Sequence, residues 1–205
     1  MKLFITGIST DVGKTVVSAI ITQALKADYW KPIQAGDLDQ SDTHKIKAYV
    51  SNAKTKFFEN SYALNTPASP HLAAAIDGIT IDLKKIKEPK TKNNLVIEGA
   101  GGLYVPINDT ETIADLIQPD YKIIVVSRHY LGSINHTLLT IEALQNRNIA
   151  VAGIIFNGEE NDATESIILN KTKIPMIGRL EPEPFINTNV INEYANLWRE
   201  KLQAL

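Results

Sequence analysis

The most constraining feature of this 205-residue chain is its opening stretch. A short apolar run over residues 2–6 precedes a turn of small and polar residues, and Gly13-Lys14-Thr15 then leads into an apolar run over residues 16–21. Strand, turn and helix in this order predict a phosphate-binding loop, in which backbone N–H groups and the helix dipole converge on one anion. We expect Lys14 to reach the β- and γ-phosphates of a nucleotide and Thr15 to offer its hydroxyl to Mg²⁺.

The spacing of this loop departs from the usual pattern, which has a glycine where this chain has Ile8. The nearest glycine is Gly7, so the loop is one residue longer. A simpler interpretation is a strand–helix turn that happens to contain Gly-Lys-Thr. The triplet nevertheless stands at the start of a helix that follows the first strand, which favours nucleotide binding.

Composition narrows the class of protein. Apolar residues make up 44% and charged residues 21%, which is ordinary for a globular domain, and the net charge of -2 gives no indication of nucleic acid or of an anionic membrane as partner. The chain has no cysteine, which excludes disulfides, thiolate metal sites and cysteine nucleophiles. No apolar run approaches the about 20 residues of a membrane span, and the first residues do not resemble a signal peptide. We therefore expect a cytoplasmic enzyme.

Apolar runs alternate with helical patterns along the chain. The sequence predicts strands over residues 2–6, 29–33, 94–98, 122–127, 150–156 and 176–180, and helices over 13–26, 41–52, 72–76, 133–147, 162–171 and 187–205. Pro32 indicates that the second strand ends there or lies at a sheet edge. This order predicts a single α/β domain over residues 1–205, of P-loop NTPase-like architecture, with a parallel sheet and helices on both faces.

Ligands of such sheets bind beyond the carboxyl ends of the strands. Lys31 stands in an otherwise apolar strand, either as a snorkelling side chain at an edge or as a second cation aimed at the phosphates. Glu98 ends an apolar strand before a glycine-rich segment, where a carboxylate for Mg²⁺ belongs, although a tight turn alone would also explain the segment. Asp42 is either a second Mg²⁺ ligand or an acid favoured by the dipole of its helix.

Two further segments follow predicted strands. Asn157-Gly158 is followed by Glu159-Glu160, so the Asn-Lys-x-Asp pattern of guanine specificity is absent, whereas the Asn157 amide can hydrogen-bond adenine. Residues 131–136 open a helix, and the free N–H groups there would bind a carboxylate or phosphate, unless Ser133 simply caps the helix. We interpret His136 as structural rather than catalytic.

Taken together, these motifs resemble the dethiobiotin synthetase family. The resemblance covers nearly the whole chain, and its most specific parts are Glu98-Gly99-Ala100-Gly101-Gly102 and the Gly-x-Ile-Asn-His segment at residues 132–136. The other matching segments are Thr6-Gly7 through Gly13-Lys14-Thr15, Lys31-Pro32, Ser41-Asp42, Ser69-Pro70-His71 and Asn157.

The resemblance implies a homodimeric P-loop enzyme that uses 7,8-diaminononanoate, CO₂ (or bicarbonate) and MgATP. An amine of the substrate becomes a carbamate, the carbamate accepts the γ-phosphoryl group of ATP, and the second amine closes the ureido ring with release of phosphate. The expected products are dethiobiotin, ADP and phosphate, which places the enzyme in biotin biosynthesis.

The resemblance also implies roles for individual residues. Lys14 and Lys31 would be catalytic, and Thr15, Asp42 and Glu98 would hold Mg²⁺. The expected ATP-binding residues are Asp11, Val12, Gly13, Lys14, Thr15, Val16, Asp42, Glu98, Gly99, Ala100, Gly101, Asn157 and Gly158, with the segment after Gly178 on the outer side of the base. The expected substrate-binding residues are Thr10, Lys31, Ala35, Gly132, Ser133, Ile134 and Asn135, the last four holding the substrate carboxylate across the dimer interface.

The chain departs from the family pattern in two places. Many members carry Ser or Thr where this chain has Ala35, close to the diamine, and residues 181–184 match the adenine loop only loosely. One alternative is a P-loop switch ATPase of the partitioning or metal-delivery type, but such proteins usually carry an extra lysine early in the loop, where this chain has Ile8, Ser9 and Thr10. A second alternative, an amidotransferase-type synthetase, would usually need a glutaminase domain with a cysteine nucleophile.

Overall fold

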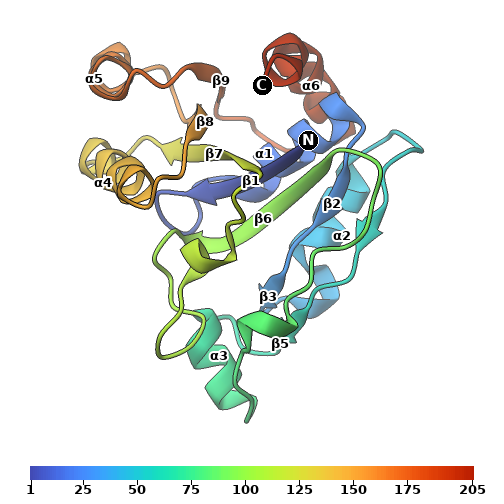
Figure 1. Ribbon diagram of the computed structural model, residues 1–205. Helices are drawn as coiled ribbons and strands as arrows, with labels where there is room; N and C mark the ends of the chain where they lie inside the picture. Colours follow the sequence, from blue (N-terminus) through green and yellow to red (C-terminus); the bar gives the residue numbers. More distant parts are fainter.

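The computed structural model describes all 205 residues, and it consists of one large parallel sheet with helices on both faces (Figure 1). The seven strands lie in the order β4-β2-β6-β1-β7-β8-β9, and every pairing between them is parallel. Their bounds are β1 Lys2–Gly7, β2 Asp28–Trp30, β4 Phe57–Phe58, β6 Leu95–Gly102, β7 Tyr121–Arg128, β8 Val151–Asn157 and β9 Met176–Leu180. The predicted α/β fold class is confirmed.

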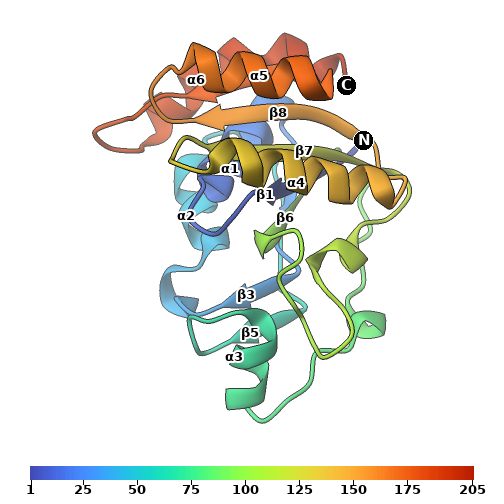
Figure 2. The same cartoon turned by 90° about the vertical axis from the view of Figure 1, so that its left-hand side faces the viewer.

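The helices form two layers. Helices α1, α2 and α6 pack together on one face of the sheet, and α4 and α5 pack together on the other (Figures 1 and 2). Their bounds are α1 Lys14–Leu25, α2 Asp42–Tyr49, α4 Ser133–Asn146, α5 Asp162–Thr172 and α6 Thr188–Gln203, with short 3₁₀ turns η1 Leu38–Gln40, η2 Leu83–Lys85 and η3 Ile113–Leu116. None of these helices combines the length and the apolar character that crossing a membrane requires.

A small second layer lies beyond the carboxyl ends of the central strands. The strands β3 Ile33–Ala35 and β5 Tyr62–Leu64 pair in parallel, and helix α3 Pro70–Ile76 packs against both (Figure 2). This unit stands over the end of the sheet where ligands of such folds bind. It therefore supplies a wall for a cleft.

The structure tests several expectations about the strands. Of the two alternatives at Pro32, the end of the strand is confirmed: β2 stops at Trp30, and β3 begins after the proline, which has no N–H to donate to a ladder. The edge alternative is wrong, because β2 lies between β6 and the two-residue β4, which is too short to recognise in the sequence. Glu98 lies within β6 rather than at its end, because the glycines after it continue the pairing as far as Gly7 opposite Gly102.

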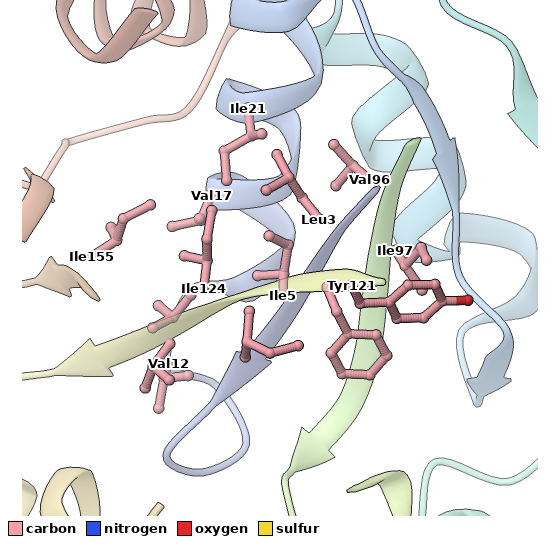
Figure 3. Packing of buried hydrophobic residues seen from close by; sticks show 14 of the residues in the cluster. Leu3, Ile5, Val12, Val17, Ile21, Val96, Ile97, Tyr121, Ile124 and Ile155 are labelled. Atoms are coloured by element: carbon pink, nitrogen blue, oxygen red, sulfur yellow. The ribbon is translucent and has the colours of Figure 1, made fainter. Parts of the chain in front are cut away.

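The central core fixes helix α1 on the sheet. Leu3 and Ile5 of β1 and Val96 of β6 face Val17 and Ile21 of α1, and all five side chains are inaccessible to solvent (Figure 3). Side chains of a strand alternate between the two faces, so this set occupies one face only. Because α1 begins directly after the loop that leaves β1, this packing holds the first helical turn over the end of the sheet.

Candidate active site

The loop between β1 and α1 is held by contacts from neighbouring strands. Gly13 is the N-cap of α1 with φ of 96°, and a Cβ atom there would lie 2.5 Å from Nδ2 of Asn157, so only glycine fits. Asn157 Nδ2 donates to the carbonyl of Val12 at 2.9 Å, and Arg128 donates to the carbonyl of Asp11 at 3.0 Å. The loop is therefore preorganised, with the free N–H groups of α1 beyond it.

The loop forms one wall of a cleft of about 760 Å³. The small β3–β5–α3 unit, helix α2 and strand β6 contribute the other walls. Most of the predicted nucleotide, metal and substrate residues line this cleft, namely Thr10, Asp11, Gly13, Lys14, Thr15, Val16, Lys31, Ala35, Asp42, Glu98, Ala100 and Gly101. The predicted nucleotide residues Val12, Gly99, Asn157 and Gly158 do not line it; Val12 is buried in the core beneath the loop, and the Asn157 amide donates to the loop itself.

Several cleft residues were not recognised in the sequence. They are Gln34, Asp37, Lys45, Tyr49, Pro67, Ala68 and Val105. Ser69 and Pro70 also line the cleft; the family resemblance includes them but gave them no role. The segment 67–70, with prolines at both ends, forms part of the cleft wall. A loop with two fixed prolines is stiff, which is the one signal in the sequence that pointed to a wall.

Three charged side chains and the hydroxyl of Thr15 meet in the cleft. The Lys31 ammonium bonds to Oδ2 of Asp42 and lies 3.2 Å from Oε1 of Glu98, and the same glutamate oxygen accepts a hydrogen bond from the Thr15 hydroxyl at 3.0 Å. Lys31 is only 6% exposed and Glu98 only 1%. Lys31 is thus a buried, paired cation, and the alternative of a lysine that snorkels from an edge strand is wrong.

The two active-site lysines have different electrostatic surroundings. Burial alone would discharge Lys31, but the carboxylates of Glu98 and Asp42 outweigh it and hold the pKa of Lys31 above its usual value. Burial lowers the pKa of Lys14 to about 8, and the Lys14 ammonium contacts only the carbonyl of Ser9, at 3.0 Å. Lys14 is therefore the cation that remains available for an incoming anion.

Helix α2 places Asp42 in this cluster. Ser41 caps the helix by accepting a hydrogen bond from the N–H of His44. Gln34 of β3 accepts from the N–H of Asp42 at 3.3 Å, which ties the start of α2 to the small sheet. Burial opposes charge on Asp42, but Lys31 outweighs burial and holds its pKa below the usual range. Asp42 is consequently an anion at neutral pH.

The oxygen donors in this cluster suit a magnesium ion. The Thr15 hydroxyl and the Glu98 carboxylate are in contact, and the Asp42 carboxylate is joined to Glu98 through a single ammonium group. Mg²⁺ prefers hard oxygen ligands and usually takes only one or two carboxylates besides the phosphates and water. The three side chains predicted as ligands therefore fit the ion in type and in number.

The segment predicted to hold the substrate carboxylate lies elsewhere. Gly132, Ser133, Ile134 and Asn135 line a separate depression of about 970 Å³, together with Gly158. Gly132 is the N-cap of α4, with φ of 102°, and no side chain caps the helix, so the alternative of capping by Ser133 is wrong. His136 contacts the Tyr130 hydroxyl at 2.8 Å. One chain by itself does not bring residues 132–135 into the cleft.

The segment after Gly178 is held by an ion-pair network. Arg179 contacts Glu160 at 2.7 Å, Glu165 at 2.8 Å and Glu181 at 2.7 Å, and His129 contacts the same oxygen of Glu165 at 2.9 Å. The network joins the end of β9 to α5 and to the loop after β8. It fixes the loops beside Asn157, and this role of Arg179 was not foreseen from the sequence.

Comparison with known proteins identifies a matching family model and similar proteins. The family model described as "AAA domain" matches residues 1–189. The chain is 60% identical over 199 residues to the ATP-dependent dethiobiotin synthetase BioD of Christiangramia forsetii, covering 97% of this chain and 96% of that protein. It is 50% identical to the protein of the same name from Cytophaga hutchinsonii, with 95% of each chain covered.

Solved structures with similar folds include ATPases of other kinds. The cell division ATPase MinD of Pyrococcus furiosus has a TM-score of 0.60 at 12% identity, covering 99% of this chain and 98% of that chain. MinD of Pyrococcus horikoshii, complexed with Mg-ADP, has a TM-score of 0.59 at 14% identity, covering 98% of this chain and 94% of that chain. At such low identity the likeness concerns the P-loop NTPase-like fold alone. The full-length matches at 50–60% identity, together with the phosphate loop and its charged cleft, lead to one conclusion: the chain belongs to the family of ATP-dependent dethiobiotin synthetases.

Proposed function

We propose that this protein catalyses the ATP-dependent conversion of 7,8-diaminononanoate and CO₂ into dethiobiotin, ADP and phosphate, in the cytoplasm as a step of biotin biosynthesis. The observation that carries the proposal is the cluster of Thr15, Lys31, Asp42 and Glu98 beside a preorganised phosphate loop, in a chain of this family. The switch-ATPase alternative has no comparable support, because the ATPases of that kind share only the fold.

The phosphate loop binds and orients the nucleotide in this proposal. The N–H groups at the start of α1 hold the β- and γ-phosphates, and Lys14, which has no carboxylate partner, pairs with them. Mg²⁺, when bound, neutralises charge on the phosphate oxygens. Thr15, Asp42 and Glu98 would hold it there. Asn157 and Gly158 would contact the adenine, as the family resemblance implies.

The lysines then stabilise charge during the group transfers. An amine of the diamine attacks CO₂ and loses a proton, which gives a carbamate. The carbamate oxygen attacks the γ-phosphorus and ADP leaves. The second amine attacks the carbamoyl carbon, and phosphate leaves as the ring closes. Lys31, which lines the cleft beside Glu98, would balance the negative charge of carbamate and phosphoryl group.

A direct assay tests this function. The purified protein is incubated with ATP, Mg²⁺, bicarbonate and diamine, and dethiobiotin is measured by mass spectrometry alongside ADP. We expect equal amounts of both products and little ATP hydrolysis without diamine. ATP hydrolysis that is unaffected by the diamine, with no dethiobiotin formed, would contradict the proposal and favour a switch ATPase.

Replacing the predicted Mg²⁺ ligands should change the magnesium dependence. Glu98→Gln and Asp42→Asn keep the shape of each side chain and remove a hard anionic oxygen. We expect each variant to need more Mg²⁺ for half-maximal turnover and to transfer phosphate about 100-fold more slowly. Magnesium titrations of the initial rate measure both effects. If both variants keep the magnesium titration curve and the rate of the parent, Glu98 and Asp42 are not Mg²⁺ ligands.

We further propose that the active enzyme is a homodimer with shared sites. Residues 132–135 lie outside the cleft of their own chain, and Leu131, Ile134 and Leu139 expose large apolar side chains around them. Covering this surface with a second copy would bury apolar area and would bring the N-terminus of α4, an anion site, to the partner's cleft. The long alkyl tail of the substrate separates its carboxylate from its amines, which fits such an arrangement.

Mixed dimers test the shared site. Lys31→Ala is expected to lack chemistry, and Asn135→Asp is expected to repel the substrate carboxylate, so each homodimer should be nearly inactive. A heterodimer regains one intact site if each site uses Lys31 of one chain and Asn135 of the other. We expect activity near half of the parent's per heterodimer. If subunit exchange is demonstrated independently and no activity returns, the carboxylate is held within one chain.

A further inference from the structure

The two oxygens of the Glu98 carboxylate have different surroundings. Oε1 faces the cleft and accepts hydrogen bonds from the Thr15 hydroxyl at 3.0 Å and from the Lys31 ammonium at 3.2 Å. Oε2 points away from these groups and accepts a hydrogen bond from the hydroxyl of Tyr29 at 2.9 Å. Tyr29 is absent from the cleft lining and is fully buried. One carboxylate thus connects the cleft to a phenol in the core.

The strand geometry explains why Tyr29 reaches Glu98. Tyr29 of β2 pairs with Val96 of the adjacent strand β6, and side chains two residues apart share a face of the sheet. Tyr29 and Lys31 therefore lie on the face that carries Val96 and Glu98, beneath helix α1. The tyrosine ring extends toward Glu98, and it also packs against the ring of Phe57, with centroids 6.2 Å apart and planes at 56°.

The hydrogen bond from the Tyr29 hydroxyl restricts the orientation of the Glu98 carboxylate. The terminal torsion of a glutamate is broad, so the plane of its carboxylate can turn at little cost. The Lys31 ammonium has three donors and can bond to either carboxylate oxygen, so it does not fix this plane by itself. A hydrogen bond from a buried phenol to the ionised carboxylate opposes that rotation, because breaking it would leave Oε2 buried and unpaired.

We propose that Tyr29 is a positioning residue of the active site: it holds Oε2 of Glu98 in the core and so keeps Oε1 directed at the cleft as a single, fixed ligand oxygen for Mg²⁺. The inference rests on the proposed role of Glu98 as a Mg²⁺ ligand. It adds a residue that touches neither substrate nor nucleotide and that the sequence motifs did not indicate. Phenylalanine would fill the same space, so the hydroxyl alone carries the role.

The test is Tyr29→Phe, with Tyr121→Phe as the matched control. Tyr121 also donates its hydroxyl to a glutamate, Glu88, at 2.7 Å, but it lies at the start of β7, outside the cleft. Calorimetry measures the affinity for ADP at increasing Mg²⁺ concentrations, without turnover. We expect Tyr29→Phe to need about tenfold more Mg²⁺ for half-maximal tightening of ADP binding, the effect of one lost hydrogen bond to a charged group. Tyr121→Phe should match the parent.

A double mutant shows whether Tyr29 acts through Glu98. In the Glu98→Gln background, Tyr29→Phe should leave the Mg²⁺ dependence of ADP binding unchanged, because the ligand that it orients is already lost. In the otherwise native protein, we expect the kcat of Tyr29→Phe to fall about tenfold, while the KM for the diamine stays constant. Thermal unfolding without Mg²⁺ records any loss of stability separately.

Each outcome decides the inference. A Tyr29→Phe protein with the parent's Mg²⁺ titration overturns it, even if that variant is less stable, since lost stability alone indicates a structural role. An equal shift in the Glu98→Gln background also overturns it. If the parent binds ADP independently of Mg²⁺, the metal site and the inference fail together. If the parent makes no dethiobiotin but shows the expected Mg²⁺ shifts, the proposed function fails and the role of Tyr29 stands.

Discussion

Replacing Lys31 by methionine should both stop turnover and lower the free energy of unfolding by about 3–5 kcal/mol. Methionine keeps most of the side-chain volume and removes the charge. Glu98 and Asp42 would then face each other across a buried space without their shared cation, and an uncompensated buried charge is costly. The loss of one cation beside the transferring phosphoryl group should reduce kcat about 10²–10³-fold.

Chemical denaturation and initial rates measure the two effects of Lys31→Met. Lys2→Met is the matched control, because Lys2 also joins two carboxylates, Glu88 at 2.8 Å and Asp120 at 2.9 Å, but does so at the surface. That variant should lose no more than about 1 kcal/mol and keep its activity. Saturating Mg²⁺ should restore part of the stability of Lys31→Met, since a divalent cation would compensate the same carboxylates. Stability equal to the parent's without Mg²⁺ would contradict the buried ion pair.

Lys14→Ala should also stop turnover but, unlike Lys31→Met, should leave the stability nearly unchanged. The Lys14 ammonium contacts only one carbonyl, and burial lowers its pKa to about 8, so its charge is already disfavoured in the free protein. Removing it gives up an attraction to Glu98 and relieves a repulsion with Lys31, and these two effects oppose each other. Its expected contact with the phosphates is charge-assisted and sheltered from water, so its loss should reduce kcat about 10²–10³-fold.

The measurement for Lys14→Ala pairs nucleotide titration with unfolding. We expect a free energy of unfolding within about 1 kcal/mol of the parent's in the absence of nucleotide, because the substitution removes one hydrogen bond and no ion pair. Lys47→Ala, an exposed substitution on helix α2, controls for the higher helix propensity of alanine. Near-normal turnover by Lys14→Ala would contradict the proposed role of Lys14 in binding the phosphates. A large loss of stability would mean that Lys14 supports the fold instead.

The sequence predicted Lys14 and Lys31 as active-site cations but did not predict their different partners. Both were predicted as catalytic cations, since Lys14 belongs to a local motif and Lys31 interrupts an apolar run. The motif could not reveal that Lys31 is paired while Lys14 is not, because the partner Glu98 lies 67 residues from Lys31 along the chain. The contact depends on β2 pairing beside β6, which is a property of the strand order.

The sequence by itself determined the features that arise from local interactions. Alternating apolar runs and helical patterns specify a parallel sheet with helices on both faces, because periodicity fixes which face of each element is buried. Gly13-Lys14-Thr15 at a helix start specifies the phosphate loop, and the Ser41 cap specifies the start of α2. In each case the interacting groups lie within a few residues of one another.

The tertiary structure alone decided what depends on register and on packing between distant elements. It paired the residues after Pro32 with β5 in a separate small sheet, placed β2 inside the large sheet and continued β6 through the glycines beyond Glu98. It tied Asn157 to the loop carbonyl of Val12, and it kept residues 132–135 out of their own chain's cleft. Tyr29 is the clearest case. In the sequence it is one apolar strand residue among many, and only the register of β2 on β6 brings its hydroxyl to Glu98.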